Sequence, residues 1–426
     1  MFTVDQLAVF NGMPAFAQPL HVGRPNVCGQ DKFIARTNDI LDRKWLTNYG
    51  PYVQEFERRI TAITGAKHCI AVTNATVGLE VLFHALGLRG EVIVPSFTFI
   101  ATAHALRWLG ITPIFCDIDP RTHNLDPVRV EQLITPRTTG ILGVHTWGRG
   151  CDHAALSRVA SEYNLKLIYD AAHAFACSYN GQMIGNLGHG EVFSFHATKF
   201  LNTFEGGAIM TNDDALATRL RSSINFGYDE DDDIVCLGIN GKMSEVSAAM
   251  GITGLESLDV LIARNYQNYC AYQAELEGLP GIKLLEYDQL EKNNYQYIVV
   301  EIDPDEAGID TDTLVRVLHA ENVLARRYFY PGCHMAEPYR TERPTAGTSL
   351  PCTNVLAERV MTLPNGMAVG LSEIRTIVRL IAIAIENGKA IRQQLDKTEP
   401  RRKSQYELLH VQPIFKDHRE MESKCR

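Results

Sequence analysis

The sequence lacks the features that mark several common classes of protein. Its ten cysteines are scattered singly, with no C-x-x-C pair, which argues against a zinc site or a disulfide framework. No window approaches the roughly eighteen apolar residues of a membrane-spanning helix, and MFTVDQLAVFNGMPAF has no basic start followed by a long apolar run, as a signal peptide would. We therefore expect a cytoplasmic protein with reduced core thiols, among them Cys69, Cys116 and Cys177.

An excess of positive charge is also missing. The chain has 41 basic and 50 acidic residues and a formal net charge of -9. Proteins that bind nucleic acids or anionic membranes need a basic face, so neither is an expected partner. Any anionic substrate must be held by local groups.

Short β-rich runs alternate with helical runs between residues 68 and 212. HCIAV precedes VGLEVLFHAL and EVIVPSF precedes ATAHALRWL; further strand-like runs are TPIFCDI, GILGVH, LKLIYD, EVFSFH and AIMT. This alternation predicts an α/β fold with a mostly parallel, doubly wound sheet and helices on both faces. Ligands bind at the carboxyl ends of the strands in such sheets.

The remaining patterns predict how the chain is divided. A helical stretch from Ser244 to about Leu276 is expected to lead out of the large domain, after a solvated acidic loop at 229–233. Strand-like KLLEY and YQYIVVEID, helical DTLVRVLHAE and a long apolar helix near 371–386 indicate a smaller α+β domain. We predict an N-terminal arm (1–30), a large domain (31–260), a small domain (261–396) and a charged tail (397–426).

Two strand ends in the large domain are followed by candidate ligand groups. Thr73-Asn74-Ala75-Thr76 precedes a helix, so its backbone N–H groups and the helix dipole suit a phosphate; the same residues also suit a simple N-cap. LKLIYDAAHAF places Asp170 at a strand end and His173 three residues later. Asp170 either caps the next helix or keeps a cationic ring nitrogen protonated.

A third strand end carries Lys199, within VFSFHATKFLNTFEGGAIM. Most lysines are solvated surface charges, but the buried run before Lys199 and its polar neighbours favour a site at a strand end. An amine removed from water has a lowered pKa and can act as a nucleophile. Together with Ser194 as a phosphate hydroxyl, the three strand ends meet the requirements of pyridoxal 5'-phosphate: a Schiff-base lysine, a partner for the pyridinium nitrogen and a phosphate cradle.

These motifs resemble a known family. TNATVGLEVL, VPSFTFIATAHAL, VHTWG, YDAAHAF, SFHATKFLNTFEGGAI and GINGKMSE resemble, in order and spacing, the DegT/StrS-type sugar aminotransferases, which have the aspartate aminotransferase (type I) fold. The resemblance extends from WLTNYGPYVQEFE to FYPGCHMAEPY. Within the family, the chain looks most like the dTDP-4-keto-6-deoxyglucose 4-aminotransferases of deoxyaminosugar pathways such as desosamine biosynthesis.

The resemblance implies a role for each candidate residue. Lys199 would form the Schiff base, Asp170 would pair with the pyridinium nitrogen, and His173 would lie beside the ring hydroxyl. The other implied cofactor contacts are the phosphate ligands Ala75, Thr76 and Ser194, the ring-stacking Phe99, and Asn240, which would reach the phosphate of the other subunit's cofactor. This arrangement implies a homodimer with active sites at the subunit interface.

Contacts with the sugar nucleotide are expected from other segments. The family's N-x-R motif is here Asn240-Gly241-Lys242, and lysine cannot reproduce a bidentate guanidinium contact. An arginine would pair with a diphosphate, although arginine pairs are usually solvated and aromatic runs are usually core. The candidate substrate contacts are Thr47, Asn48, Tyr49, Lys242, Arg326, Tyr330 and His334.

We predict a pyridoxal-phosphate-dependent aminotransferase that moves the amino group of L-glutamate to a nucleotide-linked keto sugar. By resemblance, the reaction converts dTDP-4-keto-6-deoxyglucose to dTDP-4-amino-4,6-dideoxyglucose. Amination of a 3-keto sugar and cofactor binding without turnover, in a regulatory protein, remain as alternatives. Lys199 disfavours the dehydratases of this family, in which histidine replaces the lysine, and Gly238 to Lys242 is too short for a P-loop.

Overall fold

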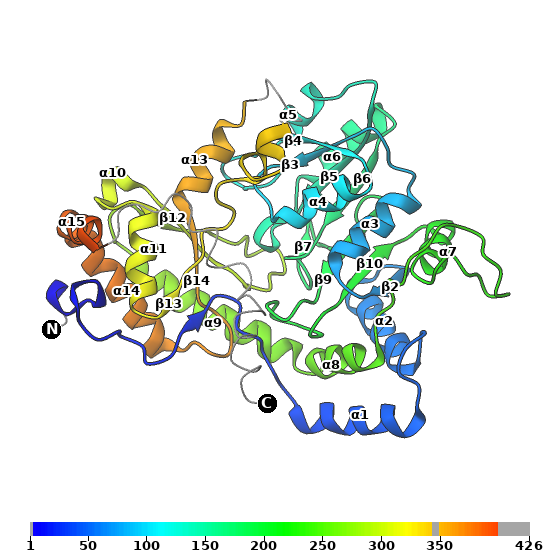
Figure 1. The fold of residues 1–426 in the computed structure, drawn as a ribbon, viewed down its shortest axis with the longest axis horizontal. Coiled ribbons are helices and arrows are strands. Elements are labelled where there is room, and N and C mark those ends of the chain that lie inside the picture. Colours follow the sequence, from blue (N-terminus) through cyan, green and yellow to red (C-terminus); the bar gives the residue numbers. More distant parts are fainter. Residues whose placement is uncertain (1–2, 343–348, 399–426) are drawn as a thin grey trace, which may run out of the picture.

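The computed structural model describes residues 3–342 and 349–398, so most of the predicted tail lies outside the described residues. A seven-stranded sheet in the order β2-β10-β9-β6-β5-β3-β4 forms the larger part of the molecule (Figure 1). Its strands, in chain order, are β2 (His68–Val72), β3 (Glu91–Pro95), β4 (Thr112–Cys116), β5 (Thr138–Val144), β6 (Lys166–Asp170), β9 (Gly190–Ser194) and β10 (Gly207–Thr211).

The predicted α/β fold with a mostly parallel sheet is confirmed. All neighbouring strands are parallel except those paired with β10, which runs antiparallel to both β2 and β9. β10 reverses because the segment 195–206, which connects it to β9, contains no helix, whereas a parallel partner needs a crossover connection.

Helices cover both faces of this sheet (Figure 1). Successive side chains of a strand point to opposite faces, so Val192 of β9 joins one apolar core and Phe193 joins the other. The core with Val192 includes α3 (Ala75–Ala85), α4 (Ile100–Trp108) and α7 (Asp214–Ser223). The core with Phe193 includes α2 (Pro51–Thr64), α5 (Pro127–Gln132), α6 (His153–Glu162) and α8 (Glu245–Leu255).

A second, smaller unit is built on a three-stranded antiparallel sheet. Its strands are β11 (Ile282–Leu284), β12 (Ile298–Ile302) and β14 (Val360–Leu363). One apolar core joins them to α9 (Leu258–Leu276), α11 (Thr311–Ala320) and α14 (Leu371–Glu386). The predicted strands and helices of this region are present, while the domain boundaries remain predictions.

The prediction of one helical stretch from Ser244 to Leu276 is wrong in one respect. α8 and α9 are separate helices that meet at an angle of 62°, because α8 packs on the large sheet whereas the later turns of α9 pack in the core of the smaller unit. Within the described ranges, no single helix is long and apolar enough to cross a membrane; this bent pair reaches the threshold only by length and composition.

The N-terminal segment runs along the smaller unit and then crosses to α1 (Gln30–Arg43) beside the large sheet (Figure 1). β1 (Leu20–His21) pairs in parallel with β13 (Val323–Leu324). The buried Glu321 carboxylate accepts hydrogen bonds from the backbone N–H groups of Ala8 and Ala15. These contacts fix the segment to the smaller unit.

The remaining elements are short or lie at the periphery. The cysteines of the described ranges are unpaired, and Cys69, Cys116 and Cys177 are buried as predicted. The other elements are η1 (Val4–Gln6), η2 (Ala8–Phe10), η3 (Thr146–Gly148), η4 (Cys333–Met335), β7 (Ser178–Tyr179), β8 (Gln182–Met183), α10 (Pro304–Ala307), α12 (Tyr339–Glu342), α13 (Pro351–Arg359) and α15 (Gly388–Thr398).

Candidate active site

Lys199 lies in the loop after β9, and a residue of the smaller unit holds its ammonium group. The Nζ atom donates a hydrogen bond of 3.1 Å to the hydroxyl of Tyr297, which immediately precedes β12. Removal from water lowers the pKa of Lys199 to about 8, although the Asp170 carboxylate acts in the opposite direction. A larger fraction of this amine than of an ordinary lysine is therefore uncharged near neutral pH, and the uncharged form is the nucleophile.

Asp170 is the last residue of β6 and is buried. Its Oδ2 accepts a 2.8 Å hydrogen bond from the hydroxyl of Thr102 on α4, and its Oδ1 accepts one of 3.0 Å from the backbone of Ala172. Burial raises the pKa of the Asp170 carboxyl, while these two donors and the nearby Lys199 oppose the rise. A buried carboxylate with this environment favours a cation beside it.

His173 follows Asp170 closely and is held as a neutral donor. The backbone N–H of Trp147 donates to His173 Nδ1 at 3.2 Å, which places the imidazole proton on Nε2. The His173 ring stacks against Trp147 and Phe329, with centroids 5.8 and 5.9 Å away. Burial lowers the pKa of His173 well below its usual value, and the charge of Lys199 adds to this effect. Its free Nε2–H is suited to an anionic oxygen.

The first turn of α3 lies close to the end of β9 and carries backbone donors that suit a phosphate. The side chain of Asn74 accepts the N–H of Val77, and its carbonyl accepts the N–H of Gly78. The N-cap interpretation of this turn is therefore correct, and it is compatible with anion binding, because within the described chain the amides of Ala75 and Thr76 have no acceptor.

Gly207 brings this turn close to Ser194. Gly207 opens β10 and pairs with Ser194, the last residue of β9. A Cβ at Gly207 would lie 2.8 Å from the backbone nitrogen of Ala75, a distance that side chains do not tolerate. Glycine therefore leaves room for the Ala75 amide and the Ser194 hydroxyl to face one ligand, and this donor set suits a phosphate.

A cavity of about 380 Å³ opens beside these residues. Its wall includes Phe329, which also stacks on His173, so the cavity adjoins the polar site. Most of the lining is aromatic or aliphatic, and its two charged side chains, Arg340 and Glu337, form an ion pair with each other at 2.6 Å. Representative lining residues are Thr98, Phe99, Tyr328, Phe329, Tyr330 and Arg340.

Two further predicted substrate contacts lie next to this cavity. The Arg326 guanidinium donates to the Tyr328 hydroxyl at 2.8 Å. His334 Nδ1 lies 2.7 Å from the hydroxyl of Ser96, which follows β3. Tyr330 thus lines the cavity directly, whereas Arg326 and His334 support its wall.

Of the other predicted substrate contacts, only Lys242 lies at the phosphate turn of its own chain: it forms an isolated β-bridge with Val72, and the carbonyl of Gly241 accepts the N–H of Thr73 at 2.8 Å. Tyr49 donates to the buried Glu57 at 3.0 Å, and its neighbours Thr47 and Asn48 are exposed. Lys242 donates to the side chain of Asn225 and lies over the Phe226 ring. Asn240 is exposed and forms an isolated β-bridge with Asn225.

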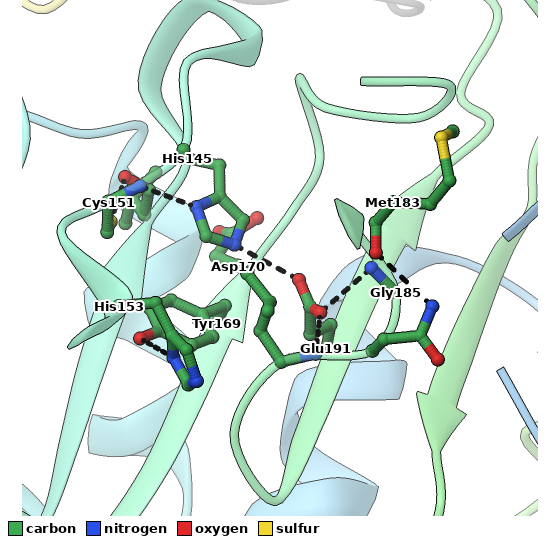
Figure 2. Close-up of polar contacts among 12 residues, drawn as sticks. His145, Cys151, His153, Tyr169, Asp170, Met183, Gly185 and Glu191 are labelled. Carbon is green, nitrogen blue, oxygen red and sulfur yellow. Dashed lines mark hydrogen bonds and ion pairs between the residues drawn. The ribbon is translucent and has the colours of Figure 1, made fainter. Parts of the chain in front are cut away.

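Sequence reasoning missed Thr102 and Tyr297, and it also missed a buried histidine–carboxylate hydrogen bond next to Asp170. His145 and Glu191 are both fully buried, with His145 Nε2 and Glu191 Oε2 3.0 Å apart. The backbone N–H of Cys151 donates to His145 Nδ1, and that of Gly185 donates to Glu191 Oε1 (Figure 2). The imidazole proton therefore faces the carboxylate.

This pair links three neighbouring strands. His145 directly follows β5, Glu191 belongs to β9, and the backbone N–H of His145 donates to the carbonyl of Asp170 on β6. No local sequence signal identifies these partners, because their contacts join segments far apart in the chain.

The sheet, with a lysine, a carboxylate and an anion-binding turn at its strand ends, defines an aminotransferase of the aspartate aminotransferase-like fold class. The model of the DegT/DnrJ/EryC1/StrS aminotransferase family matches residues 27–382. The chain belongs to this family, as the motifs predicted.

Individual relatives agree with this assignment. The chain is 38% identical over 314 residues to a dTDP-4-amino-4,6-dideoxy-D-glucose transaminase of Shigella dysenteriae, covering 74% of this chain and 85% of the relative. It is 35% identical over 345 residues to a protein of the same name from Escherichia coli, covering 80% and 92%. The structure of DesI in the presence of its TDP-sugar product superposes with a TM-score of 0.88 at 48% identity, covering 92% of this chain and 99% of DesI.

Proposed function

We propose that this enzyme is a pyridoxal-phosphate-dependent aminotransferase. Its reaction would transfer the amino group of L-glutamate to dTDP-4-keto-6-deoxyglucose and give dTDP-4-amino-4,6-dideoxyglucose. The observation that carries the proposal is Lys199 Nζ, with a pKa of about 8, at a strand end beside the buried Asp170. The names of the two bacterial relatives and the TDP-sugar product of DesI support the substrate class.

The residues at the strand ends have the chemistry that pyridoxal 5'-phosphate requires. When bound, the cofactor supplies an electron sink for the bonds at the α-carbon of the amino donor. Lys199 would hold it covalently, Asp170 would pair with its ring nitrogen, and His173 Nε2–H would donate to its ring oxygen. Its phosphate would take the amides of Ala75 and Thr76 and the hydroxyl of Ser194, and Phe99 would stack on its ring.

The chain's own groups then have distinct tasks. The uncharged Nζ of Lys199 takes the proton from the α-carbon of glutamate and later returns a proton, as its low pKa allows. Asp170 keeps a ring nitrogen protonated, because a cation beside a buried carboxylate is strongly favoured. The aromatic wall of Trp147, Phe329 and Tyr297, all buried, excludes water from these groups.

We assign the adjoining cavity to the sugar nucleotide. Its aromatic lining, with Tyr330, offers stacking surfaces. Arg326, beside Tyr328, offers a charge that could meet a diphosphate, and His334 stabilises the wall through Ser96.

We also propose a homodimer with both active sites at its interface. Next to Asn240, the segment 226–239 exposes several large apolar side chains, and α1 and the loop after Lys199 expose more. These residues are Phe226, Ile234, Val235, Leu237, Ile239, Ile34, Leu41 and Phe204, and apolar surface of this kind marks interfaces. Asn240 would reach the partner's cofactor phosphate, and Thr47, Asn48, Tyr49 and Lys242 would face the partner's substrate. Light scattering on the purified full chain would test the dimer, and a monomer in the presence of cofactor would contradict it.

The unpaired thiols suit a reducing compartment, and we place the enzyme in the cytoplasm.

Absorbance spectra test the function directly. The native chain with added pyridoxal 5'-phosphate should show a visible band that L-glutamate bleaches, and Lys199→Ala should not form it. Lys166→Ala is the matched control, since Lys166 opens β6 at the opposite end of the strand from Asp170. With dTDP-4-keto-6-deoxyglucose present, glutamate should be converted to 2-oxoglutarate and the amino sugar should be detected by mass spectrometry.

Other outcomes decide between the remaining possibilities. Turnover with a 3-keto sugar but not with the 4-keto sugar would show that the enzyme aminates C3. A visible band without turnover on either sugar would indicate a binding protein. A Lys199→Ala spectrum equal to that of the native chain would refute the role of Lys199.

A further inference from the structure

Tyr297 extends from the smaller unit to the polar edge of the large sheet. Its hydroxyl oxygen accepts the 3.1 Å hydrogen bond from Lys199 Nζ, and the same nitrogen lies 5.8 Å from the centroid of its ring. Within the described ranges this is the one hydrogen bond recorded for Nζ. The two units of the molecule therefore each contribute one partner to this contact.

The position of Tyr297 is fixed against the loop that carries His173. The two rings lie 4.5 Å apart, and the Tyr297 ring meets Trp147 edge to face at 5.4 Å. Just before Tyr297, the side chain of Asn294 donates to the carbonyls of His173 and Phe175 at 2.9 and 3.0 Å. The hydroxyl is therefore held at a set place relative to the groups at the strand ends.

The chain just before β12 is anchored from the other side as well. The side chain of Asn365 donates to the carbonyls of Tyr295 and Gln296 at 2.7 and 3.2 Å. The carbonyl of Tyr297 itself accepts the hydroxyl of Tyr287 at 2.9 Å. The side chain of Lys199 is flexible, but the Tyr297 hydroxyl that accepts its hydrogen bond is held in a fixed position.

We infer that Tyr297 is a positioning residue, whose hydroxyl holds the ε-amino group of Lys199 whenever the amine is not bound covalently to the cofactor. The inference extends the proposed function, because an amine that shuttles a proton must stay within hydrogen-bonding reach of the reacting carbon. Without this acceptor, the released side chain would sample many rotamers.

The same contact stabilises the charged form of the amine. Asp170 and His173 face it from the end of β6, Tyr297 faces it from β12, and Arg326 acts on Tyr297 from the segment after β13. Asp170 favours the ammonium and burial disfavours it. A phenol oxygen that accepts from an ammonium forms a charge-assisted hydrogen bond. Tyr297→Phe removes that acceptor and keeps the ring.

The test is a titration of Lys199 in the full chain without cofactor or substrate. The rate at which an amine-reactive reagent modifies Lys199 is measured between pH 6 and 10 by peptide mass spectrometry, for the native chain, Tyr297→Phe and Tyr272→Phe. Tyr272 is the matched control, because it is also fully buried in the smaller unit, where it donates to the carbonyl of Pro364.

Tyr297→Phe should lower the apparent pKa of Lys199 by about one unit, the size expected for a charge-assisted hydrogen bond, and Tyr272→Phe should leave it unchanged. An equal pKa in all three proteins would overturn the inference and leave the proposed aminotransferase untouched. If the titration gives the expected shift but the native chain does not convert glutamate, the proposed aminotransferase is refuted and the inference about Tyr297 stands. If Tyr297→Phe gives no cooperative unfolding transition, a crystal structure of the native chain without cofactor decides: Nζ within 3.5 Å of the Tyr297 oxygen supports the inference, and Nζ turned away overturns it.

Discussion

Replacing Thr102 by valine would remove one hydrogen bond from the Asp170 carboxylate and preserve the shape of the side chain. Thr102 is fully buried on α4, and its Oγ1 donates to Asp170 Oδ2 at 2.8 Å. The backbone N–H of Ala172 still serves the other oxygen. Thr98 Oγ1 lies 2.9 Å from Thr102 Oγ1 and loses a partner too, so Thr102→Ser, which keeps the hydroxyl, is the control.

The size of the effect follows from the charge of the acceptor. A hydrogen bond to a charged group contributes about 1.5 to 3 kcal/mol, and 1.36 kcal/mol corresponds to about one pKa unit. Thr102→Val should therefore raise the pKa of Asp170 by about one to two units, in addition to the rise that burial already causes.

The sign of the pH dependence follows as well. A carboxyl whose pKa is higher in the folded than in the unfolded chain favours folding only when it is protonated, and this contribution is lost as the pH rises through the folded pKa. At pH 7 the variant without cofactor should therefore unfold more easily than the native chain. The difference should narrow as the pH falls and Asp170 becomes protonated in both folded proteins.

Two measurements check this prediction. Urea unfolding of the three proteins from pH 4 to pH 8 gives the difference in free energy of unfolding, and the pH profile of kcat/KM gives the ionisation that limits activity at low pH. The acid limb of the profile should move up by about one to two units in Thr102→Val and stay in place in Thr102→Ser. A stability difference that does not change with pH, together with an unmoved acid limb, would refute the electrostatic role of Thr102.

Two other substitutions test the cradle and the buried pair. Gly207→Ala should weaken pyridoxal 5'-phosphate binding by about tenfold, or 1.4 kcal/mol, because its Cβ would crowd the Ala75 amide. An unchanged dissociation constant in an absorbance titration would show that this amide does not bind the phosphate. Glu191→Gln should lower the free energy of unfolding in urea by about 1.5 to 3 kcal/mol, because an uncharged amide replaces a fully buried carboxylate that accepts from His145 and from the backbone of Gly185. Arg58→Ala, which removes an exposed pair with Glu55, should change it by less than about 1 kcal/mol, and equal losses in the two variants would contradict the assignment.

The parts of the candidate site that the sequence predicted lie at the carboxyl ends of strands or a few residues beyond them. Strands buried on both faces are continuous apolar runs, so their ends are visible in the sequence, and Ala75, Asp170, Ser194 and Lys199 follow from them. Thr102 and Tyr297 carry no such signal, because each becomes part of the site only through contacts with segments distant in the chain.

The one expectation that failed, a single helical stretch, also depends on tertiary structure. The stretch from Ser244 to Leu276 has helical character throughout, but packing against two different cores divides it. The substrate contact of Tyr49 stays a prediction, since its hydroxyl donates to Glu57 within its own chain. Neither local propensity nor resemblance specifies which surface a residue will meet.

The N-terminal segment has a consequence for the order in which the molecule can be completed. Ala8 and its acceptor Glu321 are 313 positions apart. Between its anchor on the smaller unit and α1, the segment exchanges hydrogen bonds with the loop after Lys199: Asn26 donates to the carbonyl of Phe200, and Asn202 donates to the carbonyl of Asn26. The N-terminal segment is thus synthesised long before its partners on the smaller unit. A nascent chain that already contains Lys199, Asp170 and the phosphate turn still lacks Tyr297 and the anchor at Glu321, so the lysine loop reaches its final surroundings only when synthesis has passed the smaller unit.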